Sequence, residues 1–195
     1  MNKSTNIMIV GVGGQGTLLA SRILGHMLVS QGYDVKVSEV HGMAQRGGSV
    51  VTYVKYGEKV YSPTIERGEA DIIIAFELCE AARWVNYLKE DGKLIVNTQK
   101  IAPMPVITGA AAYPEGIVEK IKALGCHVIP LDALSLAEQA GNAKATNVVL
   151  MGAISTLTDF DEALWEKTIA QLVPEKFLEV NLKAFRLGRE LKMEE

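Results

Sequence analysis

The chain has 195 residues, with 20 Lys and Arg against 23 Asp and Glu and a formal net charge of -3. This length suits one domain with a full hydrophobic core and leaves no room for a large second catalytic domain. The balanced charge, with no basic cluster, argues against nucleic acid or a membrane surface as a partner. Two isolated cysteines, Cys79 and Cys126, encode neither a zinc site nor an iron–sulfur cluster.

The polar N-terminal segment, residues 1–6, lacks the basic-then-apolar pattern of a signal peptide. No apolar run approaches the roughly 18 residues that a membrane-spanning helix needs. We therefore expect a cytoplasmic protein with reduced thiols and no membrane segment.

Residues 7–10 are an apolar strand signal, and a glycine-rich stretch leads from them into a helix whose apolar residues recur until Gly32. Residues 33–40 predict a second strand, which completes a strand–helix–strand unit. Residues 49–56 predict a further strand, with a turn at Gly57-Glu58 into a short partner strand at 59–61. This pattern indicates a β-hairpin inserted into an alternation of strands and helices.

The next part of the chain returns to alternation. Apolar runs predict buried strands at 71–76 and 93–97, with a helix over 77–90 between them. Residues 103–112 combine Pro, Gly and Ala and predict an irregular connection. A helix over 117–124 and a strand over 126–131 follow.

The last third of the chain is predicted to be helical. Asp132 is a candidate helix cap and Gly141 a helix end around residues 133–140. All of 143–195 then reads as helix, with an apolar, buried stretch at 147–157 and amphipathic stretches at 161–172 and 174–191. We therefore predict one α/β domain over 1–195. It is a Rossmann-like, doubly wound, mostly parallel sheet with an inserted β-hairpin and a helical C-terminal end at 143–195.

The first glycine stretch is the leading candidate site. Gly11, Gly13 and Gly16 have the spacing of the dinucleotide-binding fingerprint, and the helix that follows would present its N–H groups and dipole to an anion. Glu39, at the end of the second predicted strand, could accept the ribose hydroxyls of NAD. The alternative is that the glycines only allow the helix to pack closely on its strand. The spacing alone leaves both interpretations open.

A second glycine loop over residues 41–48 carries Arg46, whose guanidinium suits bidentate recognition of a phosphate or carboxylate. A surface arginine in a flexible loop is the alternative. No acid–base pair follows, so we predict no catalytic residue and no metal ligand in this chain. The candidate cofactor-binding residues are Gly11, Gly13, Gly14, Gln15, Gly16, Glu39, Gln45, Arg46, Gly47 and Gly48.

Two stretches taken together resemble a known family. Gly-Val-Gly-Gly-Gln-Gly at 11–16 and Met-Ala-Gln-Arg-Gly-Gly at 43–48 are similar to the gamma-type subunit or domain of 2-oxoacid:ferredoxin oxidoreductases. The resemblance is strongest to the beta subunits of the indolepyruvate branch of that family. Residues 62–63, 71–77, 81–83 and 147–153 extend it over most of the chain.

The resemblance implies a subunit of an enzyme that oxidatively decarboxylates a 2-oxoacid, here indolepyruvate or another aryl pyruvate, to acyl-CoA and passes electrons to ferredoxin. Thiamine diphosphate, Mg and 4Fe-4S clusters are then expected on a larger alpha subunit, with coenzyme A at the interface near residues 45–48. The isolated chain would be inactive, with a homodimer left open as its assembly. A free-standing NAD(P)-dependent reductase and a nucleotide-sensing domain without chemistry remain as alternatives.

Overall fold

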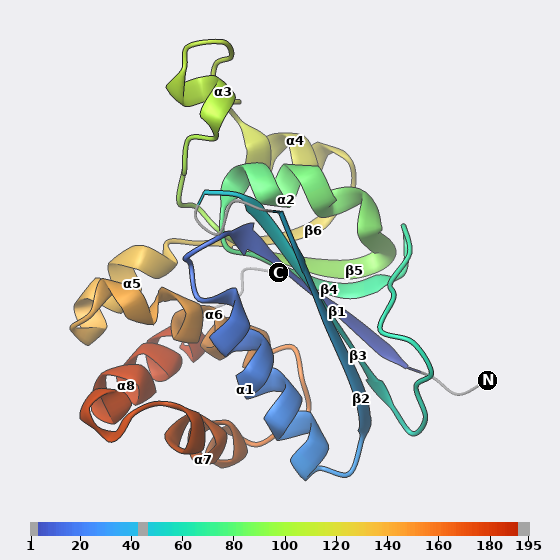
Figure 1. Cartoon of the computed structure of the whole chain (residues 1–195), viewed down its shortest axis with the longest axis vertical. Coiled ribbons are helices and arrows are strands. Elements are labelled where there is room, and N and C mark those ends of the chain that lie inside the picture. Colours follow the sequence, from blue (N-terminus) through green and yellow to red (C-terminus); the bar gives the residue numbers. More distant parts are fainter. Residues whose placement is uncertain (1–3, 43–46, 191–195) are drawn as a thin grey trace.

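The computed structural model describes residues 4–42 and 47–190 of the chain, and in this part a six-stranded sheet lies between two layers of helices (Figure 1). The strand order across the sheet is β2-β3-β1-β4-β5-β6. β3 runs antiparallel to both of its neighbours, whereas β1, β4, β5 and β6 pair in parallel. The predicted doubly wound, mostly parallel α/β sheet is confirmed. The strands are β1 (Thr5–Val12), β2 (Asp34–His41), β3 (Ser49–Gly57), β4 (Ala70–Ala75), β5 (Leu88–Asn97) and β6 (His127–Leu131).

Helices cover both faces of the sheet. One face carries α1 (Thr17–Ser30), α5 (Ala133–Ala140), α6 (Thr146–Ser155), α7 (Glu162–Leu172) and α8 (Leu178–Arg189). The other face carries α2 (Leu78–Trp84) and α4 (Ile117–Ala123), while α3 (Met104–Ile107) stands clear of the body. Short 3-10 turns lie at Val85–Tyr87, Ala143–Ala145 and Glu175–Phe177. Within the described residues, no helix combines the length and the apolar character that crossing a membrane would require.

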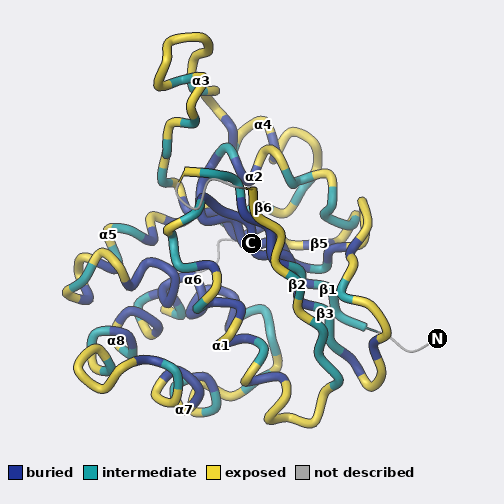
Figure 2. The backbone as a smooth tube through the Cα atoms, viewed as in Figure 1, coloured by how far each residue is buried: buried dark blue, intermediate teal, exposed yellow. Residues whose placement is uncertain are grey.

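The central strand β1 is buried on both faces, as Figure 2 shows for the middle of the sheet. Side chains alternate along a strand, so Ile7 and Ile9 pack under α1 while Met8 and Val10 pack toward α2. All four are fully buried. The near-continuous apolar run at the start of the chain is therefore the signature of a strand covered on both sides.

The C-terminal helices pack unusually closely. Every residue of α6 is buried, which confirms the predicted buried helix in this region. A Cβ atom added at Gly152 would lie 2.0 Å from the carbonyl oxygen of Phe185, and one added at Gly188 would lie 2.0 Å from that of Val149. The two glycines thus let the backbones of α6 and α8 come into direct contact.

The short strand predicted at 59–61 is not formed, and this prediction was wrong. β3 has no free edge for it, because β1 and β2 already occupy both sides. The chain instead crosses the face of the sheet, where Val60 N donates to Asp34 Oδ2 at 2.9 Å and Ile65 is buried. The antiparallel hairpin of this fold is formed by β2 and β3.

The helix predicted over 77–90 is also too long. α2 ends at Trp84, a 3-10 turn follows, and Leu88 already belongs to β5, where it pairs with Ala70. The register shifts between Ala70 and Ile72, and Gly92 allows the close approach there, since an added Cβ would lie 2.8 Å from the Ala70 carbonyl oxygen. Residues 88–90, predicted as the end of a helix, therefore begin β5, which continues through the predicted strand at 93–97.

Candidate functional site

The candidate site lies at the C-terminal ends of the parallel strands, along one end of the sheet (Figure 1). β1, β4 and β5 finish there and α1 begins there, which is the usual place for a ligand in an open α/β sheet. The glycine turn over residues 11–16 joins β1 to α1. Residues 47–48 precede β3, which begins at this same end of the sheet because it runs antiparallel to β1.

The two glycine loops are bonded directly to each other. Gly13 N donates to the Gly48 carbonyl at 2.8 Å, and Gly47 N donates to the Gly13 carbonyl at 3.3 Å. Two stretches singled out separately in the sequence therefore form one backbone structure. The predicted binding residues Gln45 and Arg46 lie outside the described residues.

The side chain of Gln15 holds the glycine turn in place. Its Oε1 accepts from Val12 N at 2.8 Å, and its Nε2 donates to the Phe76 carbonyl at 2.9 Å and to Gln99 Oε1 at 3.2 Å. One amide thus ties the turn to the ends of β1 and β4 and to the segment after β5. These contacts give Gln15 a positioning role, whatever the turn binds.

Gly16 is the point where the turn meets the C-terminal helices. Its backbone is left-handed, at φ +85°, and α1 begins after it without a side-chain cap. Asn147, at the start of α6, donates from Nδ2 to the Gly16 carbonyl at 3.2 Å. The N-terminal ends of α1 and α6 therefore converge beside the turn, and the partial positive charge of each favours an anion there.

A polar hollow of about 410 Å³ lies on the β2 side of the turn. Glu39 borders it and accepts a long hydrogen bond, 3.4 Å, from Thr52 on β3. In the dinucleotide fold the ribose-binding acid ends the strand next to β1, but here β3 separates β1 from β2, so Glu39 stands about two strand spacings, roughly 10 Å, away. The hollow is lined by Gly13, Gly14, Gly16, Thr17, Leu18, Glu39, His41 and Val50.

A second hollow, of about 590 Å³, lies on the opposite side of the turn. Lys144 lines it together with Gln99, and no acidic side chain is among its lining residues in the described part of the chain. The glycine turn thus stands between a hollow with a carboxylate and a hollow with an ammonium group. A phosphate is favoured on the Lys144 side, where the cation and the two helix ends act together. Sequence reasoning missed Lys144, because it is one exposed lysine in a short turn.

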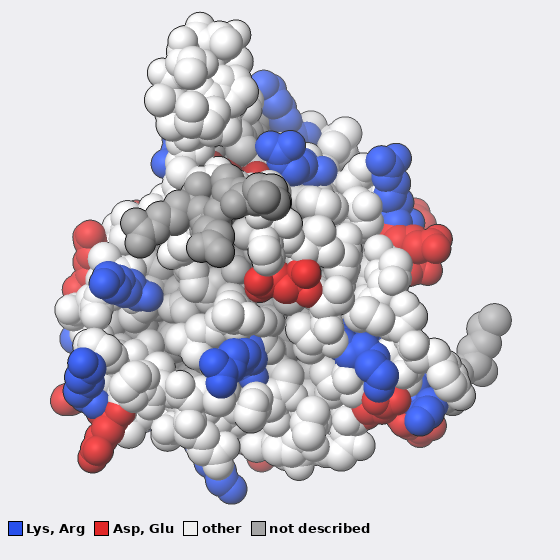
Figure 3. Space-filling view, in the orientation of Figure 1, with Lys and Arg blue, Asp and Glu red and all other residues white. Residues whose placement is uncertain are grey.

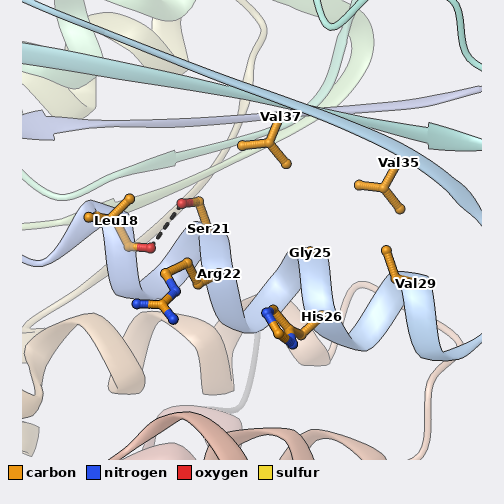
Figure 4. A pocket seen from close by; sticks show the side chains of 8 residues that line it. All are labelled: Leu18, Ser21, Arg22, Gly25, His26, Val29, Val35 and Val37. Carbon is orange, nitrogen blue, oxygen red and sulfur yellow. Dashed lines mark hydrogen bonds between the residues drawn. The ribbon is translucent and has the colours of Figure 1, made fainter.

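A third hollow, also about 410 Å³, is an apolar groove between α1 and β2. Figure 4 shows Val35 and Val37 of β2 facing α1, with Arg22 and His26 pointing away from them. Leu18 borders both this groove and the hollow beside Glu39. Arg22 and His26 also line the groove, but the part of α1 that faces the valines is apolar, so the groove offers mainly apolar contact.

A buried acidic pair lies below the second glycine loop. Glu77 caps α2 by accepting from Glu80 N at 3.0 Å, and Glu80 accepts from Ser49 Oγ, from Trp84 Nε1 at 3.2 Å and from Arg83 Nε at 3.2 Å. Ser49 directly follows the glycine loop, so Glu80 holds the base of that loop. Sequence reasoning gave neither carboxylate a role, because both are indistinguishable from ordinary residues at a helix start.

Burial raises the pKa of the Tyr113 phenol strongly, and its hydrogen bonds to Cys79 and Glu77 raise it further. Burial likewise raises the pKa of the Cys79 thiol. A neutral phenol and a neutral thiol therefore face the Glu77 carboxylate, and neither is activated as a nucleophile. Among the described residues, no three His, Cys, Asp or Glu side chains are grouped to hold a metal ion.

Fold and site together define a Rossmann-like α/β domain whose glycine turn is braced by an antiparallel third strand. A model of the pyruvate ferredoxin/flavodoxin oxidoreductase family matches residues 6–191, and the chain belongs to this family. It is 45% identical over 193 residues to indolepyruvate oxidoreductase subunit IorB of Thermococcus kodakarensis, covering 95% of each chain. The resemblance read from the two glycine stretches is thereby confirmed.

Solved structures agree. The gamma subunit of a keto/oxoacid ferredoxin oxidoreductase from Geobacter sulfurreducens superposes with a TM-score of 0.71 at 25% identity, over 95% of this chain and 96% of that chain. A 2-oxoglutarate:ferredoxin oxidoreductase from Magnetococcus marinus contains the same fold, with a TM-score of 0.67 at 19% identity. There the match covers 97% of this chain but 31% of the longer chain.

Proposed function

We propose that the whole chain acts as one gamma-type domain, the small beta subunit of an indolepyruvate-type 2-oxoacid:ferredoxin oxidoreductase. The observation that carries the proposal is the end-to-end similarity to an indolepyruvate oxidoreductase subunit, 45% over 193 residues. The complete enzyme would oxidatively decarboxylate an aryl pyruvate to the acyl-CoA and pass the electrons to ferredoxin in the cytoplasm. This chain would contribute binding and positioning, not the reacting groups.

The redox and decarboxylation cofactors are assigned to a larger alpha subunit. The two cysteines of this chain are free and only half-buried. Among the described residues, neither belongs to a group of side chains that could hold a metal ion. The 4Fe-4S clusters therefore do not fit the described residues. We assign them, together with thiamine diphosphate and Mg, to the partner, which would carry the electron chemistry. The fold's occurrence as 31% of a longer oxidoreductase chain supports a permanent association with such a partner.

We assign coenzyme A to the Lys144 side of the glycine turn. Its phosphates are anionic, and Lys144 with the adjoining ends of α1 and α6 makes this the favourable side. Glu39 makes the other hollow unfavourable for a phosphate. Gln45 and Arg46 of the second loop remain proposed contacts of coenzyme A or of the partner.

The test is reconstitution. The chain and the larger subunit are purified separately and together, and indolepyruvate- and CoA-dependent reduction of a viologen dye is measured. We expect activity from the complex only, and activity from this chain alone would refute the proposal. In the complex, Lys144→Ala should raise KM for CoA about three- to tenfold with little change in kcat, whereas Lys167→Ala on the exposed side of α7 should leave both unchanged.

The competing function is an NAD(P)-dependent reductase that uses the Glu39 hollow. The separation of β2 from β1 argues against it. Isothermal titration of the isolated chain with NAD(P) distinguishes the two functions. Saturable binding that Glu39→Gln abolishes would favour the reductase, and its absence would remove that alternative.

A further inference from the structure

Residues 101–113 form an arm that projects from the body of the molecule (Figure 1). Its sequence, Ile-Ala-Pro-Met-Pro-Val-Ile-Thr-Gly-Ala-Ala-Ala-Tyr, contains no charged residue, and the projecting part of Figure 3 is correspondingly free of acidic and basic side chains. Met104 and Ile107 at its end are each 66% exposed. Exposed apolar side chains grouped on an uncharged segment are a feature of interaction sites.

The arm has a defined conformation of its own. It contains α3, in which Ile107 N donates to the Pro103 carbonyl at 3.1 Å and Thr108 N to the Met104 carbonyl at 2.9 Å. Ala111 N then returns to the Pro105 carbonyl at 3.0 Å, closing the end of the arm on itself. The exposed apolar side chains are therefore presented on a structured element.

One buried carboxylate holds both ends of the arm. Glu77 Oε1 accepts from Ile101 N at 3.0 Å and from the Tyr113 hydroxyl. Glu77 is fully buried at the end of β4, and its second oxygen caps α2. The arm is thus fixed at its base to the rigid sheet, whereas Met104 and Ile107 belong to neither buried apolar cluster.

The base of the arm also adjoins the glycine turn. Gln99, two residues before the arm, accepts from Gln15 Nε2 at 3.2 Å and its carbonyl accepts from Leu78 N at 3.2 Å. A protein that covers the arm therefore comes to the same edge of the sheet as the candidate site.

We propose that this arm is the docking element by which the chain inserts into the larger subunit of its oxidoreductase, with Met104 and Ile107 entering an apolar recess of that subunit. The inference rests on the proposed function. The larger subunit is the fitting occupant for two reasons: the same fold is 31% of a longer oxidoreductase chain, and a subunit that carries the chemistry must meet the edge where the arm is rooted.

The experiment uses the full chain with the larger subunit of the same organism's indolepyruvate oxidoreductase, purified separately, and measures Kd by titration. Three variants are compared with the wild type. Met104→Asp/Ile107→Asp places carboxylates at the end of the arm, and Met104→Leu/Ile107→Leu keeps it apolar. Leu124→Asp is the matched control, because Leu124 is an equally exposed apolar residue, 72%, at the far end of α4.

We expect the double aspartate variant to raise Kd at least tenfold, and the double leucine and Leu124→Asp variants to stay within twofold of the wild type. All variants should keep the wild-type unfolding midpoint, because the substituted side chains are exposed. A wild-type chain that binds no larger subunit would refute the proposed function. If the wild-type chain binds the larger subunit and the double aspartate variant binds it equally well, the docking role of the arm is refuted while the proposed function stands.

The oligomeric state of the isolated chain tests the other possible occupant of the arm, a second copy of this chain. If the isolated wild-type chain is a dimer in sedimentation equilibrium and the double aspartate variant is a monomer, the arm joins two copies of this chain and the proposal is overturned. An unchanged oligomeric state together with the loss of heteromeric binding supports it.

Discussion

Asn147 and Gly16 are 131 residues apart in sequence, yet the Asn147 side-chain amide donates to the Gly16 carbonyl at 3.2 Å. A Cβ atom added at Gly16 would lie 2.7 Å from Asn147 Nδ2. The last glycine of the fingerprint is therefore required by a C-terminal helix as well as by the left-handed turn. A local motif and the far end of the chain define one geometry.

Substituting alanine at the two left-handed glycines of the turn should separate the cost of the left-handed backbone from the cost of the collision with Asn147. Gly14 and Gly16 have φ of +104° and +85°, but only at Gly16 does an added Cβ meet another side chain. We expect Gly14→Ala to lower the free energy of unfolding by about 1 kcal/mol, the cost of the backbone conformation, and Gly16→Ala by about 2–3 kcal/mol.

Urea unfolding gives both values, and the double variant Gly16→Ala/Asn147→Ala provides the control. It should recover part of the Gly16→Ala loss by removing the collision. Equal losses at Gly14 and Gly16 would mean that Asn147 imposes no constraint on the turn.

A second pair of substitutions tests the contact between α6 and α8. Gly152→Ala places its Cβ 2.0 Å from the Phe185 carbonyl oxygen, so we expect a loss of about 3 kcal/mol or more in the free energy of unfolding. Gly25→Ala is the matched change in α1, where the new methyl would lie 3.8 Å from Val37. It should raise the free energy of unfolding by about 0.5–1 kcal/mol, because alanine is the better helix former. Similar effects of the two changes would contradict the close backbone contact.

The amide of Gln15 predicts a strong effect of an almost isosteric change. In Gln15→Glu an oxygen replaces the Nε2 donor and faces two acceptors, the Phe76 carbonyl and Gln99 Oε1. We expect thermal or urea unfolding at pH 7 to show a loss of about 2–3 kcal/mol. Gln31→Glu at the exposed end of α1 should stay within about 0.5 kcal/mol. A neutral Gln15→Glu would show that the amide does not brace the turn.

The raised pKa of Tyr113 predicts an alkaline change in stability. Its phenol donates to the Glu77 carboxylate, so Tyr113→Phe should cost about 1–3 kcal/mol near pH 8. Because the folded-state pKa is raised above the unfolded value, mainly by burial, this stabilisation is complete below about pH 10 and is lost as the pH rises further. The difference between wild type and variant should therefore shrink above pH 10 in urea unfolding.

The control for this prediction is Tyr61→Phe, since Tyr61 is 86% exposed. It should change the free energy of unfolding by less than about 0.5 kcal/mol and leave its pH dependence unaltered. A difference between wild type and Tyr113→Phe that stays constant through pH 11 would contradict the raised pKa.

Local signals were sufficient for much of this fold. Asp132 caps α5 by accepting from Ser135 N at 3.0 Å, and Gly141 ends that helix at φ +116°, both as predicted. The apolar stretch after Ala145 is the buried helix α6. In each case the determining interaction lies within a few residues of the predicted feature.

What the sequence could not provide was the choice of neighbours. Residues 49–56 are predicted to be a strand on their own pattern, but nothing in that pattern says that β3 pairs with both β1 and β2. That placement removed the edge needed by the strand predicted at 59–61. It also separates Glu39 from β1, so that Glu39 does not occupy the position of the ribose-binding acid in the dinucleotide-binding fingerprint.

The candidate site shows the same division. The glycine turn was found because its spacing is local, whereas its bracing by Gln99 and Asn147 depends on contacts across 84 and 131 residues. Glu77 was quoted only as part of the resemblance. Its role at the base of the arm arises from two donors that follow it by 24 and 36 residues.

The order in which a ribosome delivers this chain gives the glycine turn an additional meaning. The turn emerges before its partners Gly48, Phe76 and Asn147, the last of which follows Gly16 by 131 residues. Until Asn147 has been made, the nascent chain contains the motif without its complete support. A fully braced turn is therefore a property of finished molecules, and prematurely terminated chains would carry the fingerprint without offering the corresponding surface to a partner.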